Sequence, residues 1–330
     1  MVDQLNTDIF GKVHMGYLVV GSRKIAEWKD FAANVIGLHP AFDSSSELAF
    51  RMDEHARRLI VLDDDAEDVL AVGWQLDSDI ELQVTLDRLA RRGVSVDYIS
   101  DGRAASRGVA SFHQFVGPKG LLIELFTEPT LDKSPLNMLC SGFVTGAAGM
   151  GHISLMSREP EGCIGFWQEL FDARVSDTIS LAAGNKTVLD VTFLRLNQRH
   201  HSVAIAATRG RPLDMFRTRI NHFNIEVATV DDLSFAHERC AESGFKITRG
   251  VGRHPNDQEL SFYMMTPSGF ELEIGWDALT VAEASWQEGK SYSNMSTWGH
   301  DVPGRFSSEL GLSHVVQIIR SLSGKEYLPW

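Results

Sequence analysis

INHFNIEV (220–227) opens the stretch that decides the fold, and FELEIGW (270–276) closes it. In INHFNIEV apolar residues alternate with polar ones, which is the period of a half-buried strand. A helical pattern follows, then a loop, the strand LSFYMM (260–265) and a turn at PSG (267–269). The whole stretch therefore predicts a βαβββ unit.

The ends of the predicted helix and the face of the closing strand can be assigned as well. Asp231 or Asp232 is expected to cap the helix, and Gly244 to end it. In the closing strand the apolar residues face the core, so Glu271 and Glu273 share the opposite face. The unit thus carries a histidine, His222, near its start and a carboxylate on its last strand.

Similar patterns start at three earlier points, near residues 13, 70 and 151. The second copy has Asp77 or Ser78 as its helix cap. Four βαβββ units predict an α+β protein of two tandem domains with two units each. We expect a non-catalytic domain over 1–135, a catalytic metal-binding domain over 136–300 and a C-terminal extension over 301–330.

Composition excludes several classes of partner. The chain has 330 residues, a formal net charge of −13 and no basic run, so nucleic acid and anionic membranes are not expected partners. The three cysteines lack CxxC spacing, which is typical of a reducing compartment. With no signal pattern and no membrane-spanning run, we expect a soluble cytoplasmic protein.

Three residues in matching places of the repeated units form a candidate metal site: His152, His222 and Glu273. Two imidazoles and one carboxylate on converging strands are the ligand set that suits non-haem Fe(II), and they leave coordination positions open. A lone strand histidine is more often a core or surface residue, and the other histidines receive that interpretation by default. The repeated position is what distinguishes His152 and His222.

Several stretches carry a family resemblance, and they are densest in the second half: FVTG (143–146), GH (151–152), NQRHHSVAIAA (197–207), INHF (220–223), GRHPND (252–257), SFY (261–263) and TPSGFELE (266–273). In combination they resemble the type I extradiol ring-cleavage dioxygenases of the vicinal oxygen chelate superfamily, especially the 2,3-dihydroxybiphenyl 1,2-dioxygenases.

The resemblance implies roles for particular residues. It makes His152, His222 and Glu273 the iron ligands, His201 the active-site acid–base, and His254 and Tyr263 polar residues that contact the substrate. Asp257 would partner a metal-ligating histidine. The implied substrate pocket includes the following residues, together with part of the segment 292–298: Ser154, Phe193, Ala204, Asn256 and Asp257.

The implied reaction inserts both atoms of O2 into a catechol, for example a 2,3-dihydroxybiphenyl or another 3-substituted catechol. The ring opens beside the two hydroxyls and gives a hydroxymuconic-semialdehyde type of product. Fe(II) is the expected cofactor, with Mn(II) as the second choice, and a homo-oligomer such as an octamer is the expected assembly. The alternative is a non-oxygenase of the same superfamily, either a metal-dependent isomerase or epimerase or a protein that sequesters a small molecule.

The first half repeats part of the site. We expect His14 to match His152 and Glu124 to match Glu273, held as a buried polar pair by hydrogen bonds. Aligning the helix-ending Gly93 with Gly244 places Ala71 opposite His222, so the third ligand is missing and one metal per chain is expected. In the extension, an apolar stripe from Leu312 to Leu322 predicts either packing on the same domain or a subunit contact.

Overall fold

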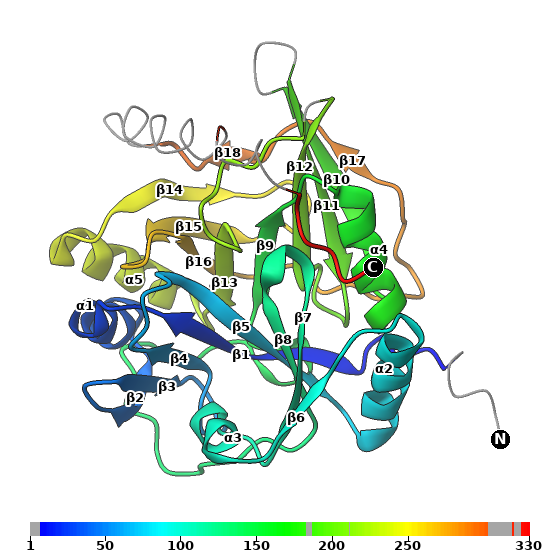
Figure 1. Cartoon of the computed structure of the whole chain (residues 1–330). Coiled ribbons are helices and arrows are strands. Elements are labelled where there is room, and N and C mark those ends of the chain that lie inside the picture. Colours follow the sequence, from blue (N-terminus) through cyan, green and yellow to red (C-terminus); the bar gives the residue numbers. More distant parts are fainter. Residues whose placement is uncertain (1–6, 183–186, 211, 303–318, 320–324) are drawn as a thin grey trace.

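A computed structural model describes residues 7–182, 187–210, 212–302, 319 and 325–330. Two β-sheets dominate it, each built from a separate half of the chain (Figure 1). The first sheet has eight strands and the second has ten. The expected α+β architecture of repeated βαβββ units is confirmed.

The first sheet contains two units in the order β2-β3-β4-β1-β5-β8-β7-β6. Its central strands β1 and β5 are antiparallel, and each begins one unit. The strands are β1 (Val13–Gly21), β2 (His39–Asp43), β3 (Glu47–Arg51), β4 (Leu59–Leu62), β5 (Asp68–Leu76), β6 (Asp97–Ile99), β7 (Phe112–Val116) and β8 (Leu122–Phe126). The helices are α1 (Ile25–Asp30), which continues as the π-helix η2 (Phe31–Ile36), then α2 (Asp79–Arg91), α3 (Gly102–Arg107) and the short η3 (Pro118–Gly120).

The second sheet repeats this plan in the order β17-β10-β11-β12-β9-β13-β16-β15-β14-β18. Its strands are β9 (His152–Met156), β10 (Arg174–Ala182), β11 (Val188–Arg195), β12 (Val203–Arg209), β13 (His222–Glu226), β14 (Ile247–Arg253), β15 (Leu260–Met265), β16 (Glu271–Trp276), β17 (Ser291–Tyr292) and β18 (Trp298–Gly299). Its helices are η4 (Gly146–Ala148), α4 (Pro160–Phe171) and α5 (Val230–Ser243). Strands β9 and β13 are antiparallel neighbours at the centre, as β1 and β5 are in the first sheet.

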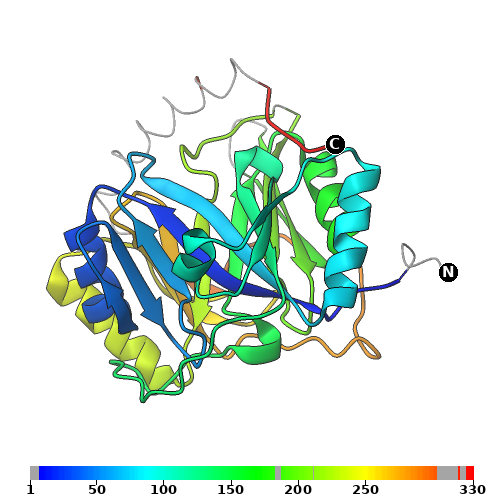
Figure 2. The same ribbon diagram turned by 60° about the horizontal axis from the view of Figure 1, so that its bottom comes forward.

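The helices of the two halves pack against one another, α5 on η2 and α4 on α2 (Figures 1 and 2). Arg239 of α5 donates to the backbone carbonyl of Val35 at 3.0 Å, and Arg88 of α2 donates to that of Leu170 at 3.0 Å. One apolar core runs through both halves, with the rings of Trp74 and Trp167 5.3 Å apart. This shared core holds the two sheets in a fixed relation.

Each sheet also has an inner face with its own apolar cluster. In the first sheet that cluster is continuous and includes Tyr17, Ala71, Phe112 and Phe126. In the second sheet the cluster around Met156, Ile179 and Phe193 borders a cavity. The difference leaves room for a ligand in the second half.

Sequence reasoning placed several helix ends correctly and one wrongly. Ser78 caps α2 by accepting a hydrogen bond from the backbone of Ile80, and Gly244 ends α5 in the left-handed conformation, both as predicted. The cap of α5, however, is Thr229, whose side chain accepts from the backbone N–H of Asp232. The helix therefore starts earlier than expected, with threonine, one of the preferred capping residues, at its N-cap.

The described end of the extension packs on its own chain. The carboxylate of Glu326 accepts hydrogen bonds from Ser157 Oγ at 2.5 Å and from the backbone N–H of Arg158 at 2.9 Å. The rings of Trp330 and Phe166 lie 4.9 Å apart. Most of the predicted stripe from Leu312 to Leu322 lies outside the described residues. Among the described residues, no helix is long and apolar enough to span a bilayer.

Candidate metal centre and cavity

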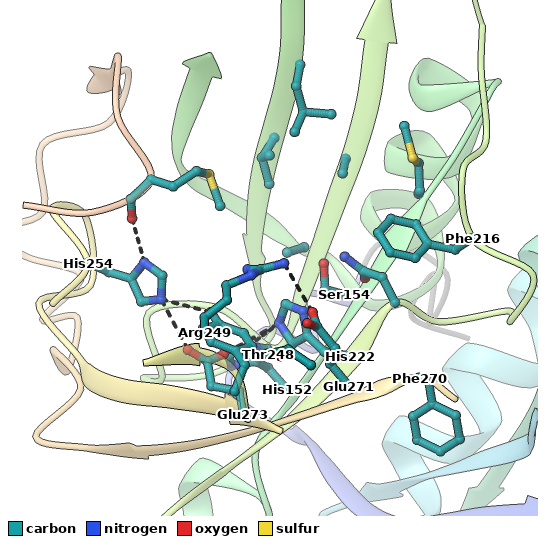
Figure 3. A pocket seen from close by; sticks show the side chains of 18 of the residues that line it. His152, Ser154, Phe216, His222, Thr248, Arg249, His254, Phe270, Glu271 and Glu273 are labelled. Atoms are coloured by element: carbon teal, nitrogen blue, oxygen red, sulfur yellow. Dashed lines mark hydrogen bonds and ion pairs between the residues drawn. The ribbon is translucent and has the colours of Figure 1, made fainter. Parts of the chain in front are cut away.

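The three predicted metal ligands converge from neighbouring strands on the inner face of the second sheet (Figure 3). His152 begins β9, His222 begins β13 and Glu273 lies within β16. The two Nε2 atoms are 3.3 Å apart, and Glu273 Oε2 lies 3.3 Å from that of His152 and 3.5 Å from that of His222. The side chains are 3%, 11% and 2% exposed, so the triangle is almost closed to solvent.

This donor set fits a divalent metal ion. Ligand atoms about 2.1 Å from a metal and at right angles to one another are about 3.0 Å apart, close to the spacing seen here. Burial lowers the pKa of His222 to about 3, despite the opposing effect of Glu273, so its ring is neutral and offers a lone pair. Two imidazole nitrogens and one carboxylate oxygen on one face match the set used by non-haem Fe(II).

His201 lies directly beside the triangle, with its ring centroid 3.9 Å from that of His152. Burial, together with the neighbouring His152 and His200, holds the pKa of His201 well below its ordinary value. Its ring is therefore neutral, with one nitrogen that donates a proton and one that accepts.

A buried chain of hydrogen bonds sets which nitrogen of His201 accepts. His200 Nε2 lies 3.0 Å from Asp177 Oδ2, an acceptor, and in the neutral ring that donates to it His200 Nδ1 is the acceptor. His201 Nδ1 lies 3.2 Å from it and donates to it. The Nε2 atom of His201 is left with the lone pair, which is the atom that a general base needs. Asn256 supports this chain by donating to Asp177 Oδ1 at 3.3 Å.

His254 and Tyr263 form a polar wall beside Glu273. His254 Nδ1 donates to the backbone carbonyl of Met295 at 2.6 Å, and its Nε2 lies 2.9 Å from Tyr263 Oη and 3.1 Å from Glu273 Oε1. Burial alone would lower the pKa of His254, but Glu273 and Asp257 outweigh it and raise that pKa to about 9. Glu273 thus favours the protonated form of His254, in which Nε2 acts as a hydrogen-bond donor. Burial beside Glu273 also raises the pKa of Tyr263 well above its ordinary value, so its hydroxyl keeps its proton.

A cavity of about 310 Å³ opens on this face. All the residues that the sequence placed in the pocket line it: Ser154, Phe193, Ala204, Asn256 and Asp257. Of the expected segment 292–298, Met295 lines the cavity. The size falls at the lower end of the range for small-molecule sites.

One expected partner lies elsewhere. Asp257 was predicted to support a metal-ligating histidine, but its Oδ2 atom is 3.7 Å from Nδ1 of His201. Its Oδ1 accepts from the backbone N–H of Glu259 at 3.1 Å. Within the described residues, Nδ1 of His222 is buried without a hydrogen-bond partner. Asp257 therefore stabilises the loop before Glu259 and lies beside His201, not beside a metal-ligating histidine.

Sequence reasoning missed several residues of the site. Arg249 extends across the cavity and donates from Nη2 to Glu271 Oε2 at 3.1 Å (Figure 3). Glu271 was predicted to share a face with Glu273, but its ionic partner was not predicted. His200 and His300 were assigned no role, whereas His300 packs 4.4 Å from His254. The doubled His200-His201 and the arginine five residues before His254 were the available signals.

In the first half of the chain, other residues stand at the positions that correspond to His152, His222 and Glu273. In the first sheet, β5 and β8 pair so that Gly73 lies opposite Glu124 and Ala71 lies opposite Leu122. In the second sheet, β13 and β16 pair in the same way, with Asn224 opposite Glu273 and His222 opposite Glu271. Ala71 therefore corresponds to His222, as predicted. Glu124 corresponds to Glu273, also as predicted.

The match proposed for His14 is wrong. The pairing of β1 with β5 sets Tyr17 opposite Gly73, which makes Tyr17 the counterpart of His152. Tyr17 Oη donates to Glu124 at 2.7 Å, and Arg107 Nε donates to the same carboxylate oxygen at 3.0 Å. His14 instead bonds to Asp77, 2.7 Å away. The irregular register near Met15 hides this shift from a count along the sequence.

Residues 149–274 match the model of the Glyoxalase/Bleomycin resistance protein/Dioxygenase superfamily, and residues 15–63 match that of the first domain of dihydroxybiphenyl dioxygenase BphC. The biphenyl-2,3-diol 1,2-dioxygenase of Metapseudomonas furukawaii is 34% identical over 293 residues, which cover 87% of this chain and 92% of that protein. The iron-dependent extradiol dioxygenase of Rhodococcus jostii is 29% identical, over 87% of this chain and 96% of that one. The crystal structure of BphC, a halotolerant catechol dioxygenase, superposes with a TM-score of 0.79 at 28% identity and covers 90% of this chain and 96% of its own.

Proposed function

The chain belongs to the extradiol catechol dioxygenases of the glyoxalase and dioxygenase superfamily, and from that premise we propose that it cleaves a 3-substituted catechol with Fe(II) held by His152, His222 and Glu273. The observation that carries the metal assignment is the triangle of two Nε2 atoms and one carboxylate oxygen, 3.3 to 3.5 Å apart. The choice of iron is supported by this ligand set and by the name of the Rhodococcus relative. Because the relatives are dioxygenases, the non-oxygenase alternative is set aside.

A bound metal would supply the Lewis acid at which a catechol and O2 meet. The chain supplies the proton chemistry. His201 Nε2 has its lone pair free because Nδ1 donates to His200, so it is placed to take a proton from a catechol hydroxyl and return it as the ring opens. Imidazole is suited to this because one ring nitrogen can accept a proton and give it back.

The polar wall orients the substrate. His254 and Tyr263 present donors beside Glu273, where they would stabilise a developing catecholate oxygen. The apolar part of the cavity, which includes Phe193 and Ala204, would hold the ring substituent and exclude water. Ser154 and Ala204 are small, which leaves room for a bulky group.

The assembly, the domain division and the location are also proposals. We assign residues 1–135 a scaffolding role and residues 136–300 the catalysis, with the chains joined in a homo-oligomer. A cytoplasmic location is supported by the three free thiols of Cys140, Cys163 and Cys240.

The test loads the protein with Fe(II) without air and then adds a panel of 3-substituted catechols and oxygenated buffer. We expect oxygen uptake matched by a yellow ring-opened product. A parallel sample loaded with Mn(II) measures which metal supports turnover. Bound iron with no oxygen uptake for any catechol in the panel would refute the proposal.

A further inference from the structure

Arg249 is a cation in the wall of the cavity. Strand pairing sets it opposite Tyr263, which in turn lies opposite Glu273, so the three side chains share the inner face of the sheet. The guanidinium carbon lies 4.5 Å from the centroid of the Tyr263 ring, and Nη2 donates to Glu271 Oε2 at 3.1 Å. In Figure 3 the side chain reaches from the His254 side of the cavity toward Glu271 and His222.

Beyond Glu271 and Tyr263, the cavity that Arg249 faces is mostly apolar. Much of the remaining wall consists of the side chains of Met156, Leu189, Val191, Phe193, Met215 and Phe216. A charge in such a wall is unfavourable unless it is paired, and Glu271 provides the pairing. If Arg249 served only to neutralise Glu271, we would expect the guanidinium to be buried together with the carboxylate. Arg249 instead keeps 31% of its side chain accessible while Glu271 keeps 9%.

A guanidinium has five N–H donors and no acceptor, so any ligand group that faces it must be an acceptor. Glu271 uses one of these donors, and within the described part of the chain it is the carboxylate that Arg249 contacts. Glu271 therefore orients the guanidinium and leaves further N–H groups available to a ligand. The planar guanidinium pairs best with two oxygen atoms on one carbon, as in a carboxylate.

We propose that Arg249 determines substrate specificity by selecting catechols whose ring substituent carries an oxygen acceptor, a carboxylate most strongly, over catechols with a purely hydrocarbon substituent. The inference rests on the proposed function, because it assumes that the catechol binds at the triad. Glu271 is then the positioning residue that holds the guanidinium toward the cavity. The apolar wall would contact the carbon atoms that link the acceptor to the ring.

The test compares three catechols of similar size, substituted next to a hydroxyl with propanoate, propanamide or isopentyl groups. For the Fe(II)-loaded wild-type protein we expect kcat/KM to fall in that order. In Arg249→Met the ratio of kcat/KM for the propanoate to that for the isopentyl compound should fall by roughly ten- to a hundred-fold, the range for loss of a charge-assisted hydrogen bond. Arg249→Lys, which keeps the charge but loses the fork, should give an intermediate ratio.

Two further variants keep the result interpretable. Arg249→Met combined with Glu271→Gln removes both charges, so it avoids a buried unpaired carboxylate and should show the same fall in the ratio. Arg209→Met serves as the matched control, since Arg209 pairs with Asp190 on an exposed part of β12 and should leave the ratio unchanged. Anaerobic calorimetric titration of the same three catechols should show the same ranking in Kd.

The outcomes separate the two claims. An unchanged propanoate-to-isopentyl ratio in both Met variants, or a wild-type preference for the isopentyl compound, would overturn the role of Arg249. Failure of all three catechols to cause oxygen uptake would count against the proposed function instead. The anaerobic Kd values would still decide in that case whether Arg249 recognises the acceptor.

Discussion

Two glutamates on one strand illustrate how position decides chemistry at the scale of the residue. Glu273 and Glu271 share the inner face of β16, yet the first meets two imidazole nitrogens and the second meets a guanidinium. Replacing Glu273 with Gln should therefore weaken metal retention, while the matched change Glu271→Gln should not. Metal content after dialysis against a chelator measures the difference, and the opposite pattern would move the ligand assignment by two residues.

His201 is predicted to act on protons and not to bind the metal. His201→Gln should leave metal content and anaerobic catechol affinity close to wild type, while kcat falls by about 10² to 10⁴, the usual contribution of a general acid–base. The reason is that glutamine has no lone pair of comparable basicity at the place of Nε2. Steady-state oxygen uptake and titration of the substrate give the two readouts. A kcat near that of wild type would assign the proton transfer to another group.

A histidine far from the site should make stability depend on pH. Burial and the nearby Arg58, only partly opposed by Asp53, lower the pKa of His55 to about 4. The unfolded chain takes up this proton at about pH 6.5, so the stabilising contribution is full above that value and declines as the pH falls toward 4. Between pH 8 and pH 5 the free energy of unfolding should drop by about 2 kcal/mol through this residue. Urea titrations of wild type and His55→Gln should differ in that drop, and equal drops would contradict the assignment.

At the scale of the element, sequence periodicity predicted the strands that alternate cleanly and missed the others. INHFNIEV and FELEIGW correspond to β13 and β16, whose apolar residues enter the core. Their residues His222, Glu271 and Glu273 line the cavity. β14, with the sequence ITRGVGR, was not predicted, because glycines interrupt its alternation and its register shifts twice against β15. That irregular strand carries Arg249, so the least predictable element holds the residue to which we assign specificity.

Strands at the edges of the sheets were also hard to predict from sequence periodicity. β2 contains a proline and has mostly exposed side chains, so it offers no periodic pattern. The candidate metal ligands, in contrast, could be picked out from the sequence because they start or lie within strongly periodic strands. The hydrogen-bond chain from Asp177 through His200 to His201 could not be predicted, since Asp177 is brought close by strand pairing over more than twenty residues.

The C-terminal segment 325–330 should stabilise the fold by joining elements of both halves. Glu326 bonds to residues that follow β9, and the carbonyl of Tyr327 accepts from the backbone N–H of Lys119 in η3 at 3.0 Å. Deleting the six residues should lower the free energy of unfolding by roughly 2 to 4 kcal/mol, from lost apolar burial and hydrogen bonds. Tyr327→Ala is the control, because that side chain is 49% exposed and its loss should cost roughly 0.5 kcal/mol or less.

Light scattering on the same deletion addresses the assembly. Because the described end of the extension packs on Phe166 of its own chain, the mass of the assembly should not change. A fall in mass would indicate that the segment takes part in a subunit contact.

For the whole molecule, the duplicated architecture raises the question of how many metal ions one chain binds. In the second half His152, His222 and Glu273 surround a space that a divalent ion fits. In the first half their counterparts are Tyr17, Ala71 and Glu124, and the charge of the carboxylate is balanced by Arg107 at 3.0 Å. In the first half a guanidinium thus occupies the electrostatic role that we assign to a metal ion in the second half.

This replacement predicts one metal ion per chain. Glu124 is fully buried, and three side chains already donate hydrogen bonds to it: those of Tyr17, Arg107 and Gln114. Arg107→Ala should therefore not create a second site, because alanine adds no ligand and Ala71 still supplies none. It should instead lower the free energy of unfolding by about 3 to 5 kcal/mol, since it leaves a buried carboxylate without its cation. Metal analysis of Fe(II)-loaded protein should give one iron per chain for wild type and variant alike, and a wild-type value near two that falls to one in Glu124→Ala would show that the first half binds metal after all.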